Sequence, residues 1–263
     1  VGDVALDAFD ISFDIQKTRK SDPNDGKVEI FNLDEDLRAL VEKSGTNIQV
    51  EAGYKNTSAI IFKGDIRFAS SNVSVAEWVT SVQAGEGEKA IRKTRLTETF
   101  TKGKTVKDVI STFVGKLEGV GQGNIAKILG PLAEQYPNGA AFDGPARKVI
   151  TDILKPFGYV FSIQNGEAQV MKADGARDDL PIVLLNYGSG LIGVPQLGEQ
   201  KDKDKPPAMR FQALLQPQIF PGRVVQLDSP GVKGQFVVDS CQHKGSNFDN
   251  EFYTTVEAYR KKA

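Results

Sequence analysis

The chain repeats a pattern of residues after 174 positions, and this repeat restricts its possible folds more than any other feature of the sequence. Residues 62–84 match residues 236–258 without a gap. The identical pairs are Phe62 and Phe236, Asp65 and Asp239, Glu77 and Glu251, Thr80 and Thr254, Val82 and Val256, and Ala84 and Ala258. A search over all offsets also produces such matches by chance, so the duplication is a hypothesis. A real period of this length indicates a duplicated domain, because solenoid repeats span only about 20–50 residues.

Residues 1–95 are predicted to form a small β-barrel or sandwich with one helix. Apolar residues at positions 9, 11, 13 and 15 alternate with polar ones, which is typical of a half-buried strand. Further strands are expected at 28–31, 48–51, 58–62 and 77–84. Asn32 and Glu35 form a capping-box pattern that opens a short helix, which is expected to end at Gly45.

Residues 96–180 have a different pattern, which predicts a small α+β domain inserted between two β regions. The expected elements are helices from Thr105 to Leu117, over 125–132 and from Pro145 to Gly158, then a hairpin of strands 159–163 and 168–171. Asn165-Gly166 lies between these two strands, and this dipeptide is typical of a two-residue hairpin turn.

Residues 181–263 return to strand patterns and are predicted to form a second β domain. The expected strands are 182–185, 211–215, 223–227, 235–238 and 252–259. Ile182–Leu185 is expected to be a buried run, and Lys201–Pro207 to be a solvated loop. The fold class is therefore mainly β with an α+β insert, in which two β-barrel or sandwich domains (1–95 and 181–263) flank a small domain (96–180).

Rare residue types exclude several classes of site. The 263 residues include one His, one Cys and one Trp. One Cys cannot form a disulfide within the chain, and His243 with Cys241 could complete a structural zinc site only with two carboxylates. A net charge of −1 argues against a basic nucleic-acid binder. No apolar run approaches the roughly 20 residues of a membrane span, and no signal peptide is visible after Val1.

Two glycine-rich segments deserve comparison with phosphate-binding loops. Gly188–Gly193 matches the spacing G-x-G-x-x-G, but Pro195 follows where a dinucleotide site needs a helix N-terminus. Gly119–Gly123 follows a predicted helix rather than a strand, which favours a helix cap and linker. We therefore assign no cofactor-binding residues to either segment.

Candidate catalytic residues also have simpler explanations. His243 lies near Asp239, Ser240 and Cys241 in sequence, but neighbours on one strand do not build a catalytic triad. The acidic group Asp34–Asp36 lies in the first turn of a predicted helix, where the helix dipole favours it, and Asp178-Asp179 lies in a predicted turn. We assign no catalytic and no metal-binding residues, and we expect no enzyme activity.

Several segments together resemble the tail-tube-like baseplate hub proteins of phages. These segments are Phe31-Asn-Leu33, Ala52-Gly-Tyr54, Ile61-Phe-Lys-Gly-Asp65, Gly190-Leu-Ile-Gly-Val-Pro195, Ile219–Leu227, Gly234–Val238, His243-Lys-Gly245 and Phe252–Ala258. The family includes hubs of contractile-tailed phages, the late control protein D group and the hub part of type VI secretion spike proteins. The resemblance covers most of the chain and is clearest near the C-terminal end, whereas residues 96–180 match only in kind.

The resemblance implies a structural role in the virion, at the tail baseplate, after assembly in the host cytoplasm. Such hubs are homotrimers, and two tail-tube-like domains per chain make a ring of six similar domains. The ring joins the hexameric tail tube, or a tube-initiator protein, to a trimeric spike protein. Its channel admits the tape measure protein and then DNA. The resemblance implies no cofactor, no sequence-specific nucleic-acid binding and no membrane contact.

Other functions are kept as alternatives. The chain could be another virion component of this fold, such as a distal tail or tube-initiator protein, or the hub of a related contractile injection system. An enzyme would need a pocket with convergent polar groups around His243 or Gly188–Gly193. A carbohydrate-binding module has only Trp78 in its favour, and an aromatic residue in an alternating strand is expected in the core.

Overall fold

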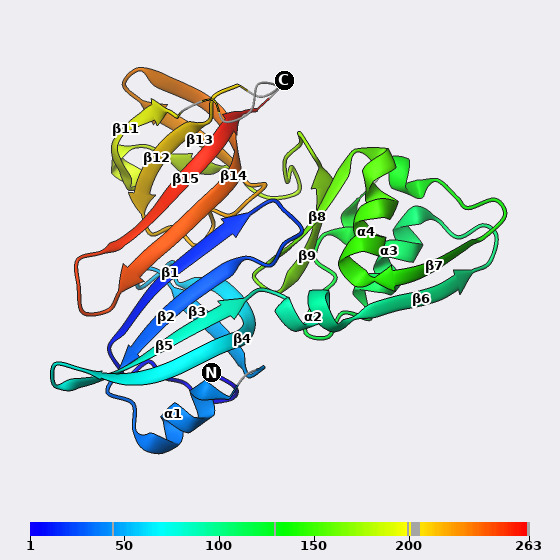
Figure 1. Cartoon of the computed structure of the whole chain (residues 1–263). Helices are drawn as coiled ribbons and strands as arrows, with labels where there is room; N and C mark the ends of the chain where they lie inside the picture. Colours follow the sequence, from blue (N-terminus) through cyan, green and yellow to red (C-terminus); the bar gives the residue numbers. More distant parts are fainter. Residues whose placement is uncertain (44, 129, 199, 201–205, 262–263) are drawn as a thin grey trace.

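The computed structural model describes residues 1–43, 45–128, 130–198, 200 and 206–261. Most strands join one 11-stranded sheet, and the other four form two separate pairs. Figure 1 shows the sheet on one side of the molecule and a smaller lobe of helices and strands on the other. Among the described residues, no helix is long and apolar enough to cross a membrane.

The first β unit contains five antiparallel strands in the order β1-β2-β5-β4-β3. Their bounds are β1 Ile11–Thr18, β2 Asp25–Phe31, β3 Asn47–Ala52, β4 Ala59–Ser74 and β5 Glu77–Gly85. Alternate residues such as Ile15, Val28 and Phe62 point into one buried cluster. Helix α1, Glu35–Glu42, adds Val41 to this core.

The second β unit has the same strand order, β11-β12-β15-β14-β13. Its bounds are β10 Val183–Leu185, β11 Leu191–Leu197, β12 Met209–Leu214, β13 Val224–Ser229, β14 Val232–Ser246 and β15 Phe252–Arg260. The short strand β10 adds to β13 in the parallel direction. A separate buried cluster, which includes Phe211, Leu227 and Val256, fills this unit.

The shared strand order supports the duplication, but it corrects the gap-free alignment. On β5 and β15 the offset of 174 is kept, because Val82 and Val256 are equivalent and both are buried. On their partners the offset is 172: Ala84 pairs with Ile66, whereas Ala258 pairs with Val238. The second hairpin therefore has a turn two residues longer, and the identity of Phe62 and Phe236 does not reflect equivalent positions.

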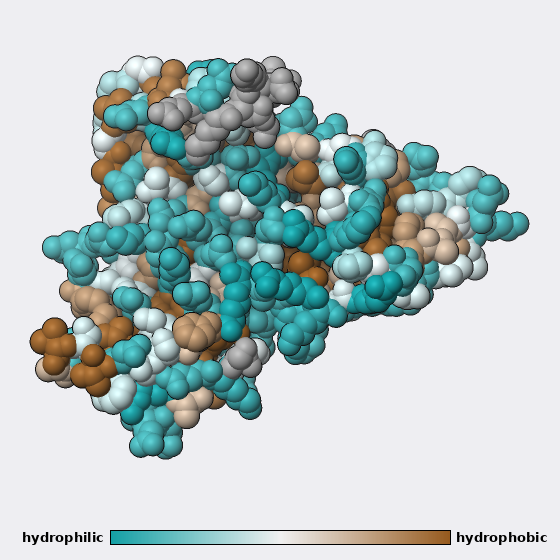
Figure 2. Space-filling view, in the orientation of Figure 1, coloured by the Kyte–Doolittle hydropathy of each residue, from teal (hydrophilic) through white to brown (hydrophobic). Residues whose placement is uncertain are grey.

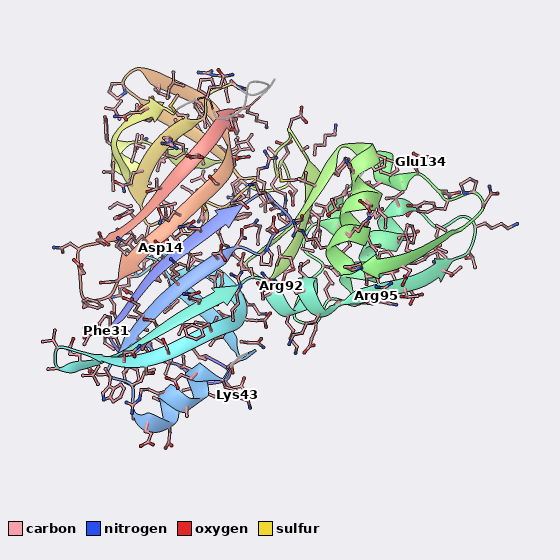
Figure 3. The ribbon with its side chains drawn as sticks, viewed as in Figure 1. Asp14, Phe31, Lys43, Arg92, Arg95 and Glu134 are labelled. Atoms are coloured by element: carbon pink, nitrogen blue, oxygen red, sulfur yellow. The ribbon has the colours of Figure 1, made fainter. Side chains whose placement is uncertain are left out.

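The two β units are joined edge to edge into the 11-stranded sheet. Strand β1 pairs antiparallel with β14, with Ser12 opposite Ser246 at one end of the ladder and Thr18 opposite Ser240 at the other. Asp14, labelled in Figure 3, accepts hydrogen bonds from Gln242 of β14 at 2.7 and 2.9 Å. No local sequence pattern predicts this pairing, because the paired residues lie more than 200 positions apart in the chain.

The insert is a compact α+β lobe. Its elements are β6 Arg95–Phe100, α3 Val106–Val114, β7 Ala140–Pro145, α4 Ala146–Leu154, β8 Tyr159–Gln164 and β9 Glu167–Lys172. Helix α2, Glu88–Lys93, precedes the insert and packs Ala90 and Ile91 into the same core. Thr105 caps α3 in a capping box with Asp108, so the predicted helix start is confirmed. Asn165 and Gly166 both have positive φ, 55° and 79°, as the predicted hairpin turn requires.

The insert also contains elements that the sequence pattern did not predict. Strands β6 and β7 form a two-stranded ribbon, although their paired residues are 40 to 50 positions apart. The expected helix over 125–132 is reduced to two 3-10 turns, Ile125–Lys127 and Pro131–Ala133. Gly130 lies between them and Pro131 begins the second turn, and a proline lacks the amide that a continuous helix would need.

Three other expectations are wrong. Asp34, not Asn32, caps α1, because Asn32 has left-handed φ 57° and its side chain instead accepts from the Trp78 amide. Trp78 is 40% exposed rather than buried, and the Arg38 guanidinium lies 4.0 Å from the centre of its ring. Leu184 is 54% exposed, because β10 lies at a sheet edge and is covered on one face only.

The predicted loop Lys201–Pro207 lies largely outside the described residues.

Candidate functional site

A buried ion pair lies where the first β unit meets the insert. Lys17 of β1 and Glu86, which follows β5, are 1% and 0% exposed, and Lys17 Nζ lies 3.2 Å from Glu86 Oε1. Lys17 Nζ also donates to Asn165 Oδ1 in the β8–β9 turn. Two charges removed from water stabilise a fold only when their remaining hydrogen bonds are satisfied.

The surrounding amides satisfy the Glu86 carboxylate. Glu86 Oε1 accepts from the main-chain amides of Asn165, at 2.8 Å, and Lys63, at 3.3 Å. Glu86 Oε2 accepts from the Asn24 side chain at 2.6 Å. Asn24 also donates to the Ile163 carbonyl at 2.9 Å. The network therefore links the β8–β9 hairpin of the insert to strands β1 and β4 of the first β unit and to the residues that precede β2 and follow β5.

Sequence reasoning missed this network, although one signal was available. Lys17 continues the alternation of Phe13 and Ile15, so a strand of that register places it on the buried face. Glu86 stands between Gly85 and Gly87 and gives no such periodic signal.

Cys241 and His243 do lie together, but within the closed core of the second unit. Cys241 Sγ lies 3.7 Å from His243 Nε2, and His243 Nδ1 lies 3.0 Å from Thr254 Oγ1. Burial raises the pKa of Cys241 to about 12. Burial, helped by the charge of Lys17, lowers the pKa of His243 to about 3. Both shifts oppose the thiolate–imidazolium pair that nucleophilic catalysis uses.

The two glycine-rich segments use their main chain for structure. Tyr187–Ser189 forms a 3-10 turn, and Gly190, with φ 101°, leads directly into strand β11 rather than a helix. In Gly119–Gly123, the amide of Gly121 donates to the Gly166 carbonyl, and the amide of Gly123 donates to the Glu167 carboxylate. These amides are already paired with protein acceptors.

Three of the acidic candidates, Asp34, Asp178 and Asp179, have protein partners. Asp34 accepts from the Leu37 amide as the α1 cap. Arg177 forms two hydrogen bonds to Asp179 and holds the pKa of that carboxyl below its usual range, and Lys261 pairs with Asp178. Within the described part of the chain, no group of three or more His, Cys, Asp and Glu side chains is close enough to hold a metal ion.

Two surface hollows formed by described residues lie away from the catalytic candidates. One hollow, in the insert between β7 and α4, is lined by Tyr136, Phe142, Val149, Ile153 and Phe157 among others. A smaller cleft between the first β unit and the insert includes Lys63, Asp65, Lys89 and Glu118. Neither includes His243 or the segment Gly188–Gly193, so neither supplies the pocket that the enzyme alternative requires.

Exposed apolar side chains gather at two places on the sheet. Figure 2 shows one such patch at the end of the β4–β5 hairpin, where Val73, Val75 and Trp78 are exposed. The other follows β11, where Ile192, Val194 and Leu197 are 40, 56 and 69% exposed. Clustered apolar surface of this kind is typical of protein–protein contacts. The candidate functional sites are therefore surfaces at the ends of the sheet.

The fold is similar to solved structures of tail proteins. A 43 kDa tail protein of prophage MuSo2 from Shewanella oneidensis matches 96% of this chain and 97% of its own, with TM-score 0.63 and 10% identity. A tail protein from Neisseria meningitidis matches 94% of this chain and 91% of its own, with TM-score 0.63 and 12% identity.

A third similar structure is the c3393 protein of E. coli, a component of the type VI secretion system described as similar to the T4 tail proteins gp27 and gp5. It matches 96% of this chain and 74% of its own, with TM-score 0.59 and 9% identity. No protein-family model and no curated protein sequence matches the chain. The likeness is one of fold.

Proposed function

We propose that the chain is a structural baseplate hub protein of a phage tail. The observation that carries the proposal is a fold shared over nearly the whole chain with two prophage or bacterial tail proteins. The repeated strand order supports it further, because a chain with two similar β units can match a sixfold tube with three copies. The hub is a homotrimer whose six tail-tube-like units, on domains 1–95 and 181–263, surround a channel.

In this proposal the duplication adapts one symmetry to another. The ring presents six similar units to the hexameric tail tube or tube-initiator protein, and three whole chains to the spike protein. Its channel admits the tape measure protein and then DNA. The protein has a structural rather than enzymatic role, and it resides in the virion tail after assembly in the host cytoplasm.

The direct test is single-particle electron microscopy of the purified protein, with light scattering for its mass. We expect a trimer with six similar lobes around a pore. A stable monomer or dimer, which remains so when tube and spike proteins are added, contradicts the proposal.

The likeness to a type VI secretion component favours one alternative, a hub of a related contractile injection system. Electron microscopy of particles that contain the protein separates the two functions. A tail attached to a DNA-filled head supports the phage hub, and a headless contractile particle supports the alternative. A distal tail or tube-initiator protein would instead appear as a ring of six chains.

A further inference from the structure

The outer edge of β14 is paired along nearly its whole length. Strand β15 occupies one side of β14. On the other side, residues 232–237 pair with β13 and residues 240–246 pair with β1. The contact with β1 is the junction between the two β units, so β14 contributes half of its outer edge to its own unit and half to the neighbouring one.

Strand β4 is the equivalent of β14, but only half of its outer edge is paired. Residues 59–65 pair with β3, just as β14 pairs with β13. Within the described chain, no strand pairs with the outer edge of residues 68–74, and no main-chain hydrogen bond outside the β4–β5 ladder involves them. Phe68 and Val73 in this segment are 57 and 59% exposed.

Strand β11 is the equivalent of β1, and its outer edge is also open. It pairs with β12 on one side, as β1 pairs with β2, and no described strand lies on its other side. Its exposed Ile192, Val194 and Leu197 accompany this open edge. The described chain thus has a second pair of strand edges equivalent to those that form the β1–β14 junction, namely β11 and residues 68–74 of β4. Neither edge is paired with another described strand.

We infer that β11 of one copy pairs antiparallel with residues 68–74 of β4 in a second copy, and so repeats the β1–β14 junction between chains. Replacing each strand by its equivalent gives the register. Within the chain, Asp14 lies opposite Lys244, and the equivalent pair between chains is Gln196 opposite Asn72. In the same way, the pair Ile15 and His243 corresponds to Leu197 and Ser71. The pair Ser12 and Ser246 corresponds to Ile192 and Ser74. This inference rests on the self-assembly in the proposed function, and it adds the strands and their register.

A second copy fits these edges better than an unrelated partner, because the two open edges are complementary parts of one chain. Such a head-to-tail contact uses different surfaces on the two copies, and it closes into a ring when the rotation permits. Exposed strand edges otherwise invite uncontrolled pairing. This pairing would also bury part of the exposed apolar side chains of Val73 and Leu197 against the neighbouring copy.

Engineered cysteines test the register. We would introduce Asn72→Cys and Gln196→Cys into the full chain, where the native Cys241 is buried. Directly opposite residues on paired strands have Cβ atoms about 4.5–5.5 Å apart, close to disulfide geometry. We expect mild oxidation to link neighbouring copies into a ladder that ends at three. The matched control, Asn72→Cys with Gln49→Cys on the edge strand β3, should give no ladder.

The outcomes separate this inference from the proposed trimer. A ladder that ends at a number other than three supports the strand pairing and contradicts the trimer. A trimer by light scattering without the Asn72–Gln196 link keeps the ring and overturns the strand pairing. No link and a monomer at the highest soluble concentration overturn the inference itself.

A second measurement does not depend on disulfide geometry. Val73→Glu or Leu197→Glu places a charge on either open edge, and each should weaken self-association at least tenfold in analytical ultracentrifugation. Val4→Glu, at another exposed valine, is the control and should leave self-association unchanged. Equal behaviour of all three variants contradicts the inference. Their unfolding midpoints should match the parent chain, because all three sites are exposed.

Discussion

The buried Lys17–Glu86 pair gives the sharpest test of how the insert is held. Glu86→Gln keeps the shape of the side chain but removes its charge. The Lys17 ammonium then stays 1% exposed without a carboxylate beside it, and its acceptors are the neutral side-chain oxygens of Asn165 and of the substituted residue. Removing one partner of a buried ion pair costs about 3–5 kcal/mol of unfolding free energy, and we expect a loss in this range.

Removing the other charge, by Lys17→Met, should lower the unfolding free energy by a smaller amount, because the two charges have different surroundings. In Lys17→Met, Glu86 keeps the amide donors of Asn24, Lys63 and Asn165. The loss is then close to one charged hydrogen bond, about 1.5–3 kcal/mol. The double variant should lose less than the sum of the two singles, by about 1–3 kcal/mol, because the residues contact each other.

Urea unfolding at pH 7 measures these differences. Far-UV circular dichroism and the fluorescence of Trp78 should follow the same transition, since a single unfolding free energy is defined only for two-state behaviour. Lys148→Met is the matched control, because Lys148 forms an exposed pair with Asp152 and should change the unfolding free energy by no more than about 0.5 kcal/mol.

Two results refute the reasoning. The first is a loss of unfolding free energy below about 1 kcal/mol for Glu86→Gln, because a buried ammonium without a carboxylate partner should destabilise the fold by more than this. The second is a loss in Lys17→Met that equals or exceeds the loss in Glu86→Gln, because the carboxylate keeps three protein hydrogen-bond donors when its partner is removed.

Three further outcomes follow from the structure. The pKa of His243 is about 3 when folded, so its stabilising contribution is complete above pH 6.5 and falls as the pH drops toward 3, by about 1.4 kcal/mol per pH unit at most; urea unfolding of His243→Gln should show a shallower decline over this range, and equal slopes contradict the assignment. Gly123→Ala should lower the unfolding free energy by at least about 1 kcal/mol, because φ is +54° and the new Cβ would lie 1.7 Å from the Ala168 carbonyl oxygen; Gly103→Ala, also at positive φ but in open space, is its control. Thr105→Ala removes the α3 cap and should cost about 1 kcal/mol by the same assay, while Thr105→Ser should cost much less.

Local patterns predicted most of the elements but not their lengths. The hairpin around Asn165-Gly166 and the helix behind Thr105 have local turn and cap signals, and both were predicted correctly. Strand β4 runs on from the predicted 58–62 to Ser74, because its outer half is exposed and is held by pairing with β5 rather than by burial. Alternation cannot indicate such a segment.

The candidate surfaces could be located only from the sheet topology, not from the sequence. The sequence repeat pointed to two β units, but only the ladders identify β11 as the equivalent of β1 and locate the open half of β4. The burial of Lys17 follows from strand alternation, whereas its partner Glu86 has no periodic signal. Contacts between distant segments therefore limited the prediction more than element type did.

The junction between β1 and β14 also sets an order of events during synthesis. Asp14 and its partner Gln242 are 228 residues apart in the chain. At translation rates of roughly 5–20 residues per second, β1 waits about 10–45 s after it leaves the ribosome before β14 is made. The first β unit must persist with this edge uncovered during that time, and its hydrophilic Asp14 and Gln16 oppose premature aggregation. Because β14 is made so late, we expect the sheet to close after the first β unit has folded.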